Sequence, residues 1–180
     1  MTVTCPLDCE FLQEARKHEK REPFHPEELP NPDIRLPRKF LQDNHDLLVF
    51  LGRALALLAG GASEAVDFDV REALDALIRT YRTLQNGVYY ETLPQNILAM
   101  NVYRIVQHGL AQFRQKERER LGMSKTRDAD VIGLLVYLQR LELSRNNGRR
   151  RGRAFLGALS EYYGAVPEPA APPPSSLILP

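Results

Sequence analysis

Two cysteines near the start of the chain have a spacing that suits a metal ion. Cys5 and Cys9 lie four residues apart, which places both thiols on one face of a helix, where they can converge on a soft metal. A zinc site needs two further ligands, and two of the chain's four histidines, His18 and His25, follow in the same region. We expect a structural zinc held by Cys5, Cys9, His18 and His25, because nothing nearby is typical of an activated-water site.

The geometry of this segment leaves other interpretations open. One continuous helix would separate Cys9 from His18 by about 14 Å along its axis, so the helix must break, or His45 or His108 must supply ligands instead. The cysteines could also be small buried hydrophobes or an oxidisable pair. Because the start of the chain lacks the basic and apolar regions of a secretory signal, we expect a cytoplasmic protein with reduced thiols.

A second unusual segment, from residue 145 to 153, reads Arg-Asn-Asn-Gly-Arg-Arg-Arg-Gly-Arg. It falls between two predicted helices, where the basic side chains add to the positive end of the second helix dipole. Such a cluster repels itself unless an anion is present, and free backbone amides with bidentate guanidinium groups suit phosphate. The candidate ligands for an anion or a nucleic acid are Arg145, Arg149, Arg150, Arg151 and Arg153.

Three interpretations of this arginine loop compete. It could be a solvated turn whose arginines pair with acidic residues such as Glu142 or Glu161. It could bind nucleic acid, including structured RNA of the ribosome, or it could bind a phosphorylated ligand or an acidic protein. The formal net charge is only +1, so a nucleic-acid footprint would be one small patch.

The elements that position these residues are predicted to be helical. Recurrent leucines at helical spacing and sparse β-branched residues indicate an all-α bundle of about five helices. We divide the chain into a Cys-containing helix with a proline-rich strap (1–38), the bundle (39–164) and a disordered proline-rich tail (165–180). The predicted helices run from an Asn44 cap to Gly60, from Asp69 to Gly87, from Pro94 to Leu121, from Asp128 to Arg145, and from Arg151 to Tyr163.

The helix from Pro94 is predicted to bury one stripe of apolar side chains. The predicted buried stripe consists of Ile97, Leu98, Val102, Ile105, Leu110 and Phe113.

Aromatic residues gather just before this helix. Tyr81, Tyr89 and Tyr90 surround an Asn-Gly turn and could line a groove, although such residues more often close the end of a bundle.

The motifs of common enzymes are missing from the sequence, so we predict a non-enzymatic binding or scaffolding protein. There is no glycine-rich phosphate loop, no serine nucleophile elbow and no metalloprotease His-Glu motif. The most apolar run, 47–59, contains Arg53 and is shorter than the roughly 20 residues of a bilayer span, so we expect no membrane partner. A protein partner is expected, a homo-oligomer is an option, and the alternative is a nucleic-acid or ribosome-associated factor that uses residues 145–153.

Overall fold

The computed structural model describes residues 29–60 and 64–164, and this part of the chain is all-α. It contains six helices and no strand, which confirms the predicted fold class. The helices are α2 (Arg38–Asp43), α3 (His45–Gly60), α4 (Asp67–Gln85), α5 (Ile97–Leu121), α6 (Asp128–Arg145) and α7 (Ala154–Tyr163).

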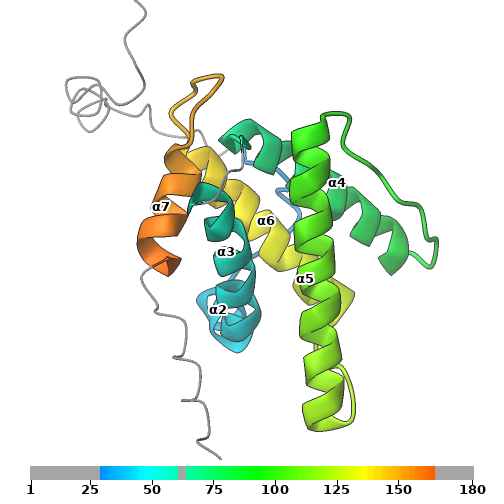
Figure 1. The fold of residues 1–180 in the computed structure, drawn as a ribbon. Coiled ribbons are helices and arrows are strands. Elements are labelled where there is room, and N and C mark those ends of the chain that lie inside the picture. The colour runs from blue at the N-terminus through cyan, green and yellow to red at the C-terminus, as the bar shows by residue number, and fades with distance from the viewer. Residues whose placement is uncertain (1–28, 61–63, 165–180) are drawn as a thin grey trace, which may run out of the picture.

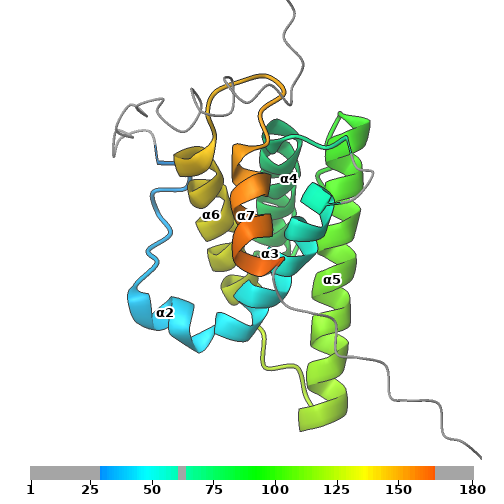
Figure 2. The same ribbon diagram turned by 60° about the vertical axis from the view of Figure 1, so that its left-hand side comes forward.

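The five longer helices form a closed ring around one apolar core. Each packs mainly on two neighbours, in the order α3, α7, α6, α4, α5 and back to α3, and the start of α4 also contacts the start of α7 (Figures 1 and 2). The core is built from leucine-rich stripes, and Leu51, Leu74 and Leu135 are fully buried in it. Among the described helices, none has the length and apolarity needed to cross a bilayer.

Several helix boundaries differ from those predicted from the sequence. The short helix α2 was not predicted, and Asn44 donates from Nδ2 to the carbonyl of Phe40 in α2 instead of capping α3. Helix α4 begins two residues before the predicted Asp69, and Asp69 accepts from the backbone amide of Val66 at 2.8 Å, which caps the start of the helix. By contrast, α6 matches the prediction at both ends.

The predicted buried stripe of α5 is wrong at two positions. Ile97 is 77% exposed and Ile105 is 39% exposed, whereas Val102, Val106 and Leu110 are buried. At 100° per residue, Val102, Val106 and Leu110 share one face of α5, and Ile105 lies 100° away from its neighbour Val106. Two isoleucines of α5 therefore face away from the core.

Helices α4 and α5 begin at the same end of the bundle, so the chain between them must travel back along α4. We call residues 86–96, which make this connection, the return segment. Asp69 in the first turn of α4 accepts a hydrogen bond from Asn96 Nδ2 at 2.8 Å, and Asn96 Oδ1 in turn caps α5 by accepting from Leu98 N at 2.8 Å. One buried carboxylate thus couples the starts of both helices.

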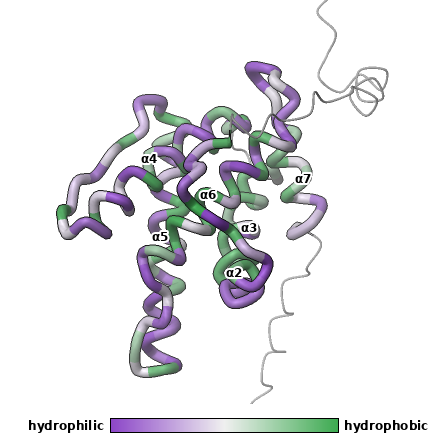
Figure 3. Tube along the Cα trace, turned by 180° about the vertical axis from the view of Figure 1, so that it is seen from behind, coloured by the Kyte–Doolittle hydropathy of each residue, from purple (hydrophilic) through white to green (hydrophobic). Residues whose placement is uncertain are grey.

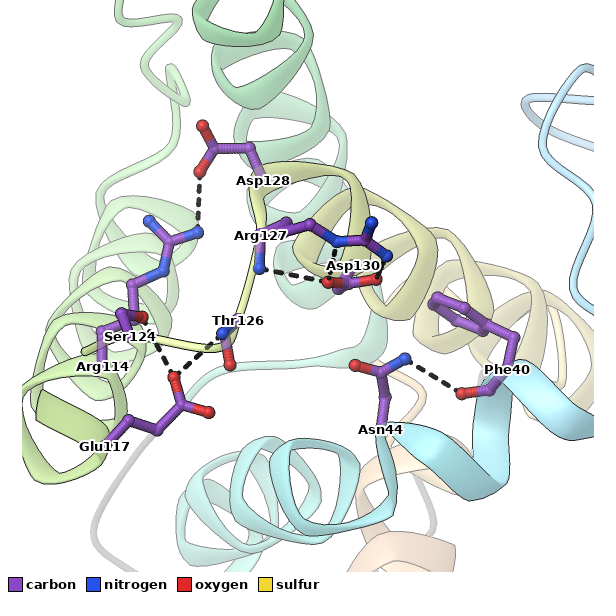
Figure 4. A network of polar contacts seen from close by, with 9 residues as sticks. All are labelled: Phe40, Asn44, Arg114, Glu117, Ser124, Thr126, Arg127, Asp128 and Asp130. Atoms are coloured by element: carbon purple, nitrogen blue, oxygen red, sulfur yellow. Dashed lines mark hydrogen bonds and ion pairs between the residues drawn. The ribbon is translucent and has the colours of Figure 1, made fainter. Parts of the chain in front are cut away.

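At the other end of α5, a polar network holds the turn into α6 (Figure 4). Helix α5 projects past the core there and ends at Gly122, which adopts a positive φ of 77°. Glu117 accepts from Ser124 Oγ and from Thr126 N, both at 3.0 Å, and Arg114 pairs with Asp128 at 2.7 Å. The turn is therefore fixed by side chains from both helices.

The described part of the predicted strap, residues 29–37, lies against α4 and α6. Arg140 of α6 donates to the backbone carbonyls of Pro30, Asn31 and Ile34. Asn31 adopts a positive φ of 54° and donates from Nδ2 to Gln139 Oε1 at 2.9 Å. In Figure 3 this segment crosses the back of the bundle before it enters α2. The strap is held by polar side chains of the bundle.

Candidate interaction surfaces

The arginine loop, residues 145–153, is fastened at its start by a buried carboxylate. Glu142 is fully buried near the end of α6 and forms two hydrogen bonds with Arg71 of α4, at 2.8 and 3.2 Å. Glu142 also accepts from Asn146 Nδ2 at 2.6 Å, which ties down the first residue after α6. The Glu142 carboxylate, considered from the sequence as a partner of the loop arginines, is bonded to Arg71 of α4.

A second buried carboxylate fastens the end of the loop and fills the anion position at the start of α7. Asp67 accepts from the backbone amides of Phe155 and Leu156, at 3.0 and 3.1 Å, and its own amide donates to the carbonyl of Gly152 at 2.9 Å. Burial raises the pKa of Asp67, although the α7 amides and Arg153 act in the opposite direction. The free amides expected for a phosphate are occupied by the protein's own carboxylate.

The five predicted arginines differ in what they contact. Arg153 donates to the carbonyl of Leu58 at 2.7 Å and so joins the loop to the end of α3. Arg149 is half-buried and has a partner of its own. Arg145, Arg150 and Arg151 are exposed, and none of them forms a hydrogen bond or an ion pair with the described residues. Three exposed arginines thus lie on a loop that is anchored at both ends. Figure 1 shows this loop between α6 and α7.

The predicted zinc ligands Cys5, Cys9, His18 and His25 all lie outside the described residues. Of the two histidines considered as replacements, His45 and His108 are both exposed. Within residues 29–60 and 64–164, no three His, Cys, Asp or Glu side chains gather where they could hold one metal ion. The bundle therefore offers no metal site of its own in the described part of the chain.

Of the exposed large apolar side chains in the described residues, five lie near one another in sequence, on the return segment and the first residue of α5. All five members are more than half exposed, which distinguishes them from the core residues on either side. We call this group the return surface, and it consists of Val88 (61% exposed), Tyr89 (67%), Tyr90 (66%), Leu93 (52%) and Ile97 (77%).

The backbone behind the return surface is held in place by α4. Thr83 Oγ1 donates to the carbonyl of Tyr90 at 3.0 Å, and Val88 N donates to the carbonyl of Thr83 at 3.0 Å. Thr80 Oγ1 accepts from Thr92 N at 2.9 Å. Further along α4, Glu72 accepts from the backbone amides of residues 95 and 96, at 2.7 and 3.2 Å. The return segment is therefore bonded to successive turns of α4, in antiparallel order.

Helix α5 holds the same segment from its other side. Glu91 accepts from the phenol of Tyr103 at 3.0 Å and from Gln107 Nε2 at 3.1 Å. Burial, together with the neighbouring Glu91 carboxylate, raises the pKa of Tyr103 to about 12 despite an opposing hydrogen bond to Thr80. The phenol is thus a neutral donor over the whole physiological pH range, and the segment is fixed between two helices.

This arrangement suits binding by contact of apolar surface. An ordered backbone that presents aromatic and aliphatic side chains loses little conformational entropy when a partner docks. Tyr89 and Tyr90 were predicted from the sequence as groove-lining candidates, whereas Val88, Leu93 and Ile97 were not. The signal that could have found them is the eleven-residue interval between α4 and α5, which is longer than most connections between helices in bundles.

Comparisons of the chain with models of known protein families, with curated proteins and with solved structures find no match.

Proposed function

We propose that this chain is a non-catalytic binding protein and that the return surface is where a protein partner docks. The observation that supports the proposal is the combination of exposure and order. Five apolar side chains are more than half exposed, yet the backbone that carries them is bonded to α4 and α5. Apolar groups kept exposed on an ordered framework are typical of interaction sites.

The composition of the return surface fits this role. Tyrosine is enriched in the central part of protein interfaces, because its flat ring supplies contact area at low conformational cost while its hydroxyl finds a polar partner. Tyr89 and Tyr90 are adjacent and both two-thirds exposed. The one charged side chain of the return segment is the exposed Glu91, and its carboxylate already accepts hydrogen bonds from Tyr103 and Gln107.

A photo-crosslinking amino acid placed at Tyr89 tests the proposal. The matched control carries the same amino acid at Tyr162, which is 79% exposed on α7. We expect one discrete adduct in cells from position 89, and none of the same mass from position 162. Equal adducts from both positions, or none from position 89, would contradict the proposal.

The arginine loop supports a second candidate, binding of nucleic acid. Arg145, Arg150 and Arg151 are exposed without partners among the described residues, and arginine suits phosphate and base edges alike. Replacing all three with alanine should weaken binding to a structured RNA hairpin and lower the salt dependence of binding. The matched control replaces the exposed Arg53, Arg104 and Arg120 instead. Binding that does not change with salt would contradict this candidate.

A structural zinc at Cys5, Cys9, His18 and His25 stays a proposal, and it assumes a reducing compartment such as the cytoplasm. Elemental analysis of the purified full chain tests it directly. We expect one zinc per chain, lost in the Cys5→Ser/Cys9→Ser double variant. The absence of stoichiometric metal from the unaltered chain would remove the proposal.

A further inference from the structure

The return surface is small compared with the interface between two folded subunits. A standard interface buries about 800 Å² on each partner and uses about 20–30 residues a side. Five side chains expose a few hundred Å² at most, because even an aromatic side chain buries only about 150–250 Å². The size of the surface therefore fits one extended segment better than a folded domain.

The exposed tyrosines indicate which kind of extended segment the return surface would bind. Proline-rich chains favour the polyproline II conformation, which has no internal hydrogen bonds and so leaves its carbonyls available as acceptors. Aromatic surfaces recognise such chains, since proline rings pack on the flat faces while phenol groups donate to the carbonyls. Tyr89 and Tyr90 are exposed and adjacent on an ordered backbone. They supply both the flat rings and the phenol donors that such a chain needs.

The chain carries a segment of this composition. Residues 166–174 read Val-Pro-Glu-Pro-Ala-Ala-Pro-Pro-Pro and follow α7 after Gly164 and Ala165. We infer that the return surface binds residues 166–174 of a second copy of this chain. This inference rests on the proposed function, because it names the partner of the same surface.

The arrangement of the helices favours a second copy over the same chain. Helix α7 packs on α3 and α6, whereas the return segment is bonded to α4 and α5, on the opposite side of the ring (Figures 1 and 2). The route between them passes over two helices, each about 10–12 Å across. From Gly164 to Pro169, a polyproline II chain spans about 16 Å. The first prolines of the chain's own segment therefore cannot lie on the return surface, whereas the whole segment of a second copy can, and reciprocal exchange gives a closed dimer.

Sedimentation velocity of the full chain over a range of concentrations tests the inference. We expect a reversible monomer–dimer equilibrium in the micromolar range. The Tyr89→Ala/Tyr90→Ala variant and a variant with Pro169, Pro172, Pro173 and Pro174 changed to alanine should each be monomeric, with unchanged circular dichroism. The Tyr162→Ala control should dimerise like the unaltered chain.

A mixing experiment gives the decisive result. The tyrosine variant keeps an intact proline segment, and the proline variant keeps an intact return surface, so an equimolar mixture should restore one of the two contacts and form a heterodimer. A synthetic peptide of residues 165–176 should compete with it. A monomeric unaltered chain, dimers in either single variant, or no heterodimer in the mixture would overturn the inference.

The same variants separate this inference from the proposed function. If the unaltered chain is monomeric while position 89 still crosslinks to one discrete protein, the return surface binds a different partner and only the inference fails. If neither crosslinks nor dimers appear, both fail.

Discussion

The carboxylate of Asp67, at the first residue of α4, accepts the backbone amide of Phe155 in α7 at 3.0 Å, across 88 positions of sequence. The residue that precedes α7, Arg153, makes no side-chain hydrogen bond to the helix start. The N-terminal cap of α7 is therefore supplied by another helix. Together with Glu142 and Arg71, this contact makes α4 the element that positions the arginine loop.

Removal of this cap should destabilise the fold. In Asp67→Ala, two buried amides of α7 lose their acceptor, so we expect the free energy of unfolding to fall by about 2–3 kcal/mol. Asp67→Asn keeps one acceptor oxygen and should lose less. Asp46→Ala, at an exposed position in the first turn of α3, is the matched control. Urea unfolding followed by circular dichroism measures all three, and an equal loss in Asp67→Ala and Asp46→Ala would contradict the role of the cap.

The same carboxylate should give a characteristic pH dependence. Because burial raises the pKa of Asp67 in the folded state, the folded protein holds this proton more tightly than the unfolded chain. Its contribution to stability is therefore greatest below the usual pKa of 3.8 and is lost as the pH rises through the raised folded value. The side chain in Asp67→Asn does not titrate, so the free energy of unfolding of this variant, relative to that of the unaltered protein, should increase as the pH rises through the folded pKa of Asp67. A difference between the two that does not vary with pH would refute the shift.

Two glycines form a matched test of helix packing. A Cβ at Gly133 of α6 would overlap the ring of Phe40, so Gly133→Ala must displace this ring and should cost about 1–3 kcal/mol. A Cβ at Gly157 of α7 meets nothing within 4 Å, so Gly157→Ala should stabilise the protein by about 0.4–1 kcal/mol. Thermal unfolding of the two variants measures the shift in Tm that each substitution causes. Shifts of the same sign would show that α2 does not pack on Gly133 as described.

The arginine that holds the strap should not be replaceable by lysine. Arg140 donates to three carbonyls at once, and the single ammonium of lysine cannot reproduce that fork. We expect Arg140→Lys and Arg140→Ala to speed amide hydrogen exchange in residues 29–37. Arg53→Ala, at an exposed position on α3, should leave this exchange unchanged. Full protection of the strap in Arg140→Lys would contradict the three-carbonyl contact.

Features set by local sequence were predictable. Helix α6 begins with acidic residues, carries a dense run of apolar residues and ends before an Asn-Asn-Gly turn, so both of its ends matched the prediction. Helix α2 was missed because it is only six residues long and buries no residue fully, which leaves no stripe to detect. Ile105 was misplaced because it keeps helical spacing with Leu98 and Val102, whereas the face of α5 that is buried runs through Ala99, Tyr103 and Val106.

Features set by distant contacts were not predictable. The cap of α7 comes from Asp67, and the spacing of residues near Phe155 gives no sign of it. The return segment has no apolar period, and the threonines that hold it, Thr80 and Thr83, resemble ordinary helix residues. The arginine loop could be recognised in the sequence because its composition is extreme. Its anchoring by Glu142 and Asp67 could not, because it depends on contacts between α4 and residues far from it in the sequence.

The return surface is exposed while its backbone is fixed, and amide hydrogen exchange of the full chain without added ligand measures this directly. We predict that the amides of Val88, Thr92, Gln95 and Asn96 exchange slowly, because each donates to α4. Thr80→Val, which removes the acceptor of Thr92, should speed exchange at residue 92. Exchange of all four amides at the rate of an unstructured peptide would contradict the account.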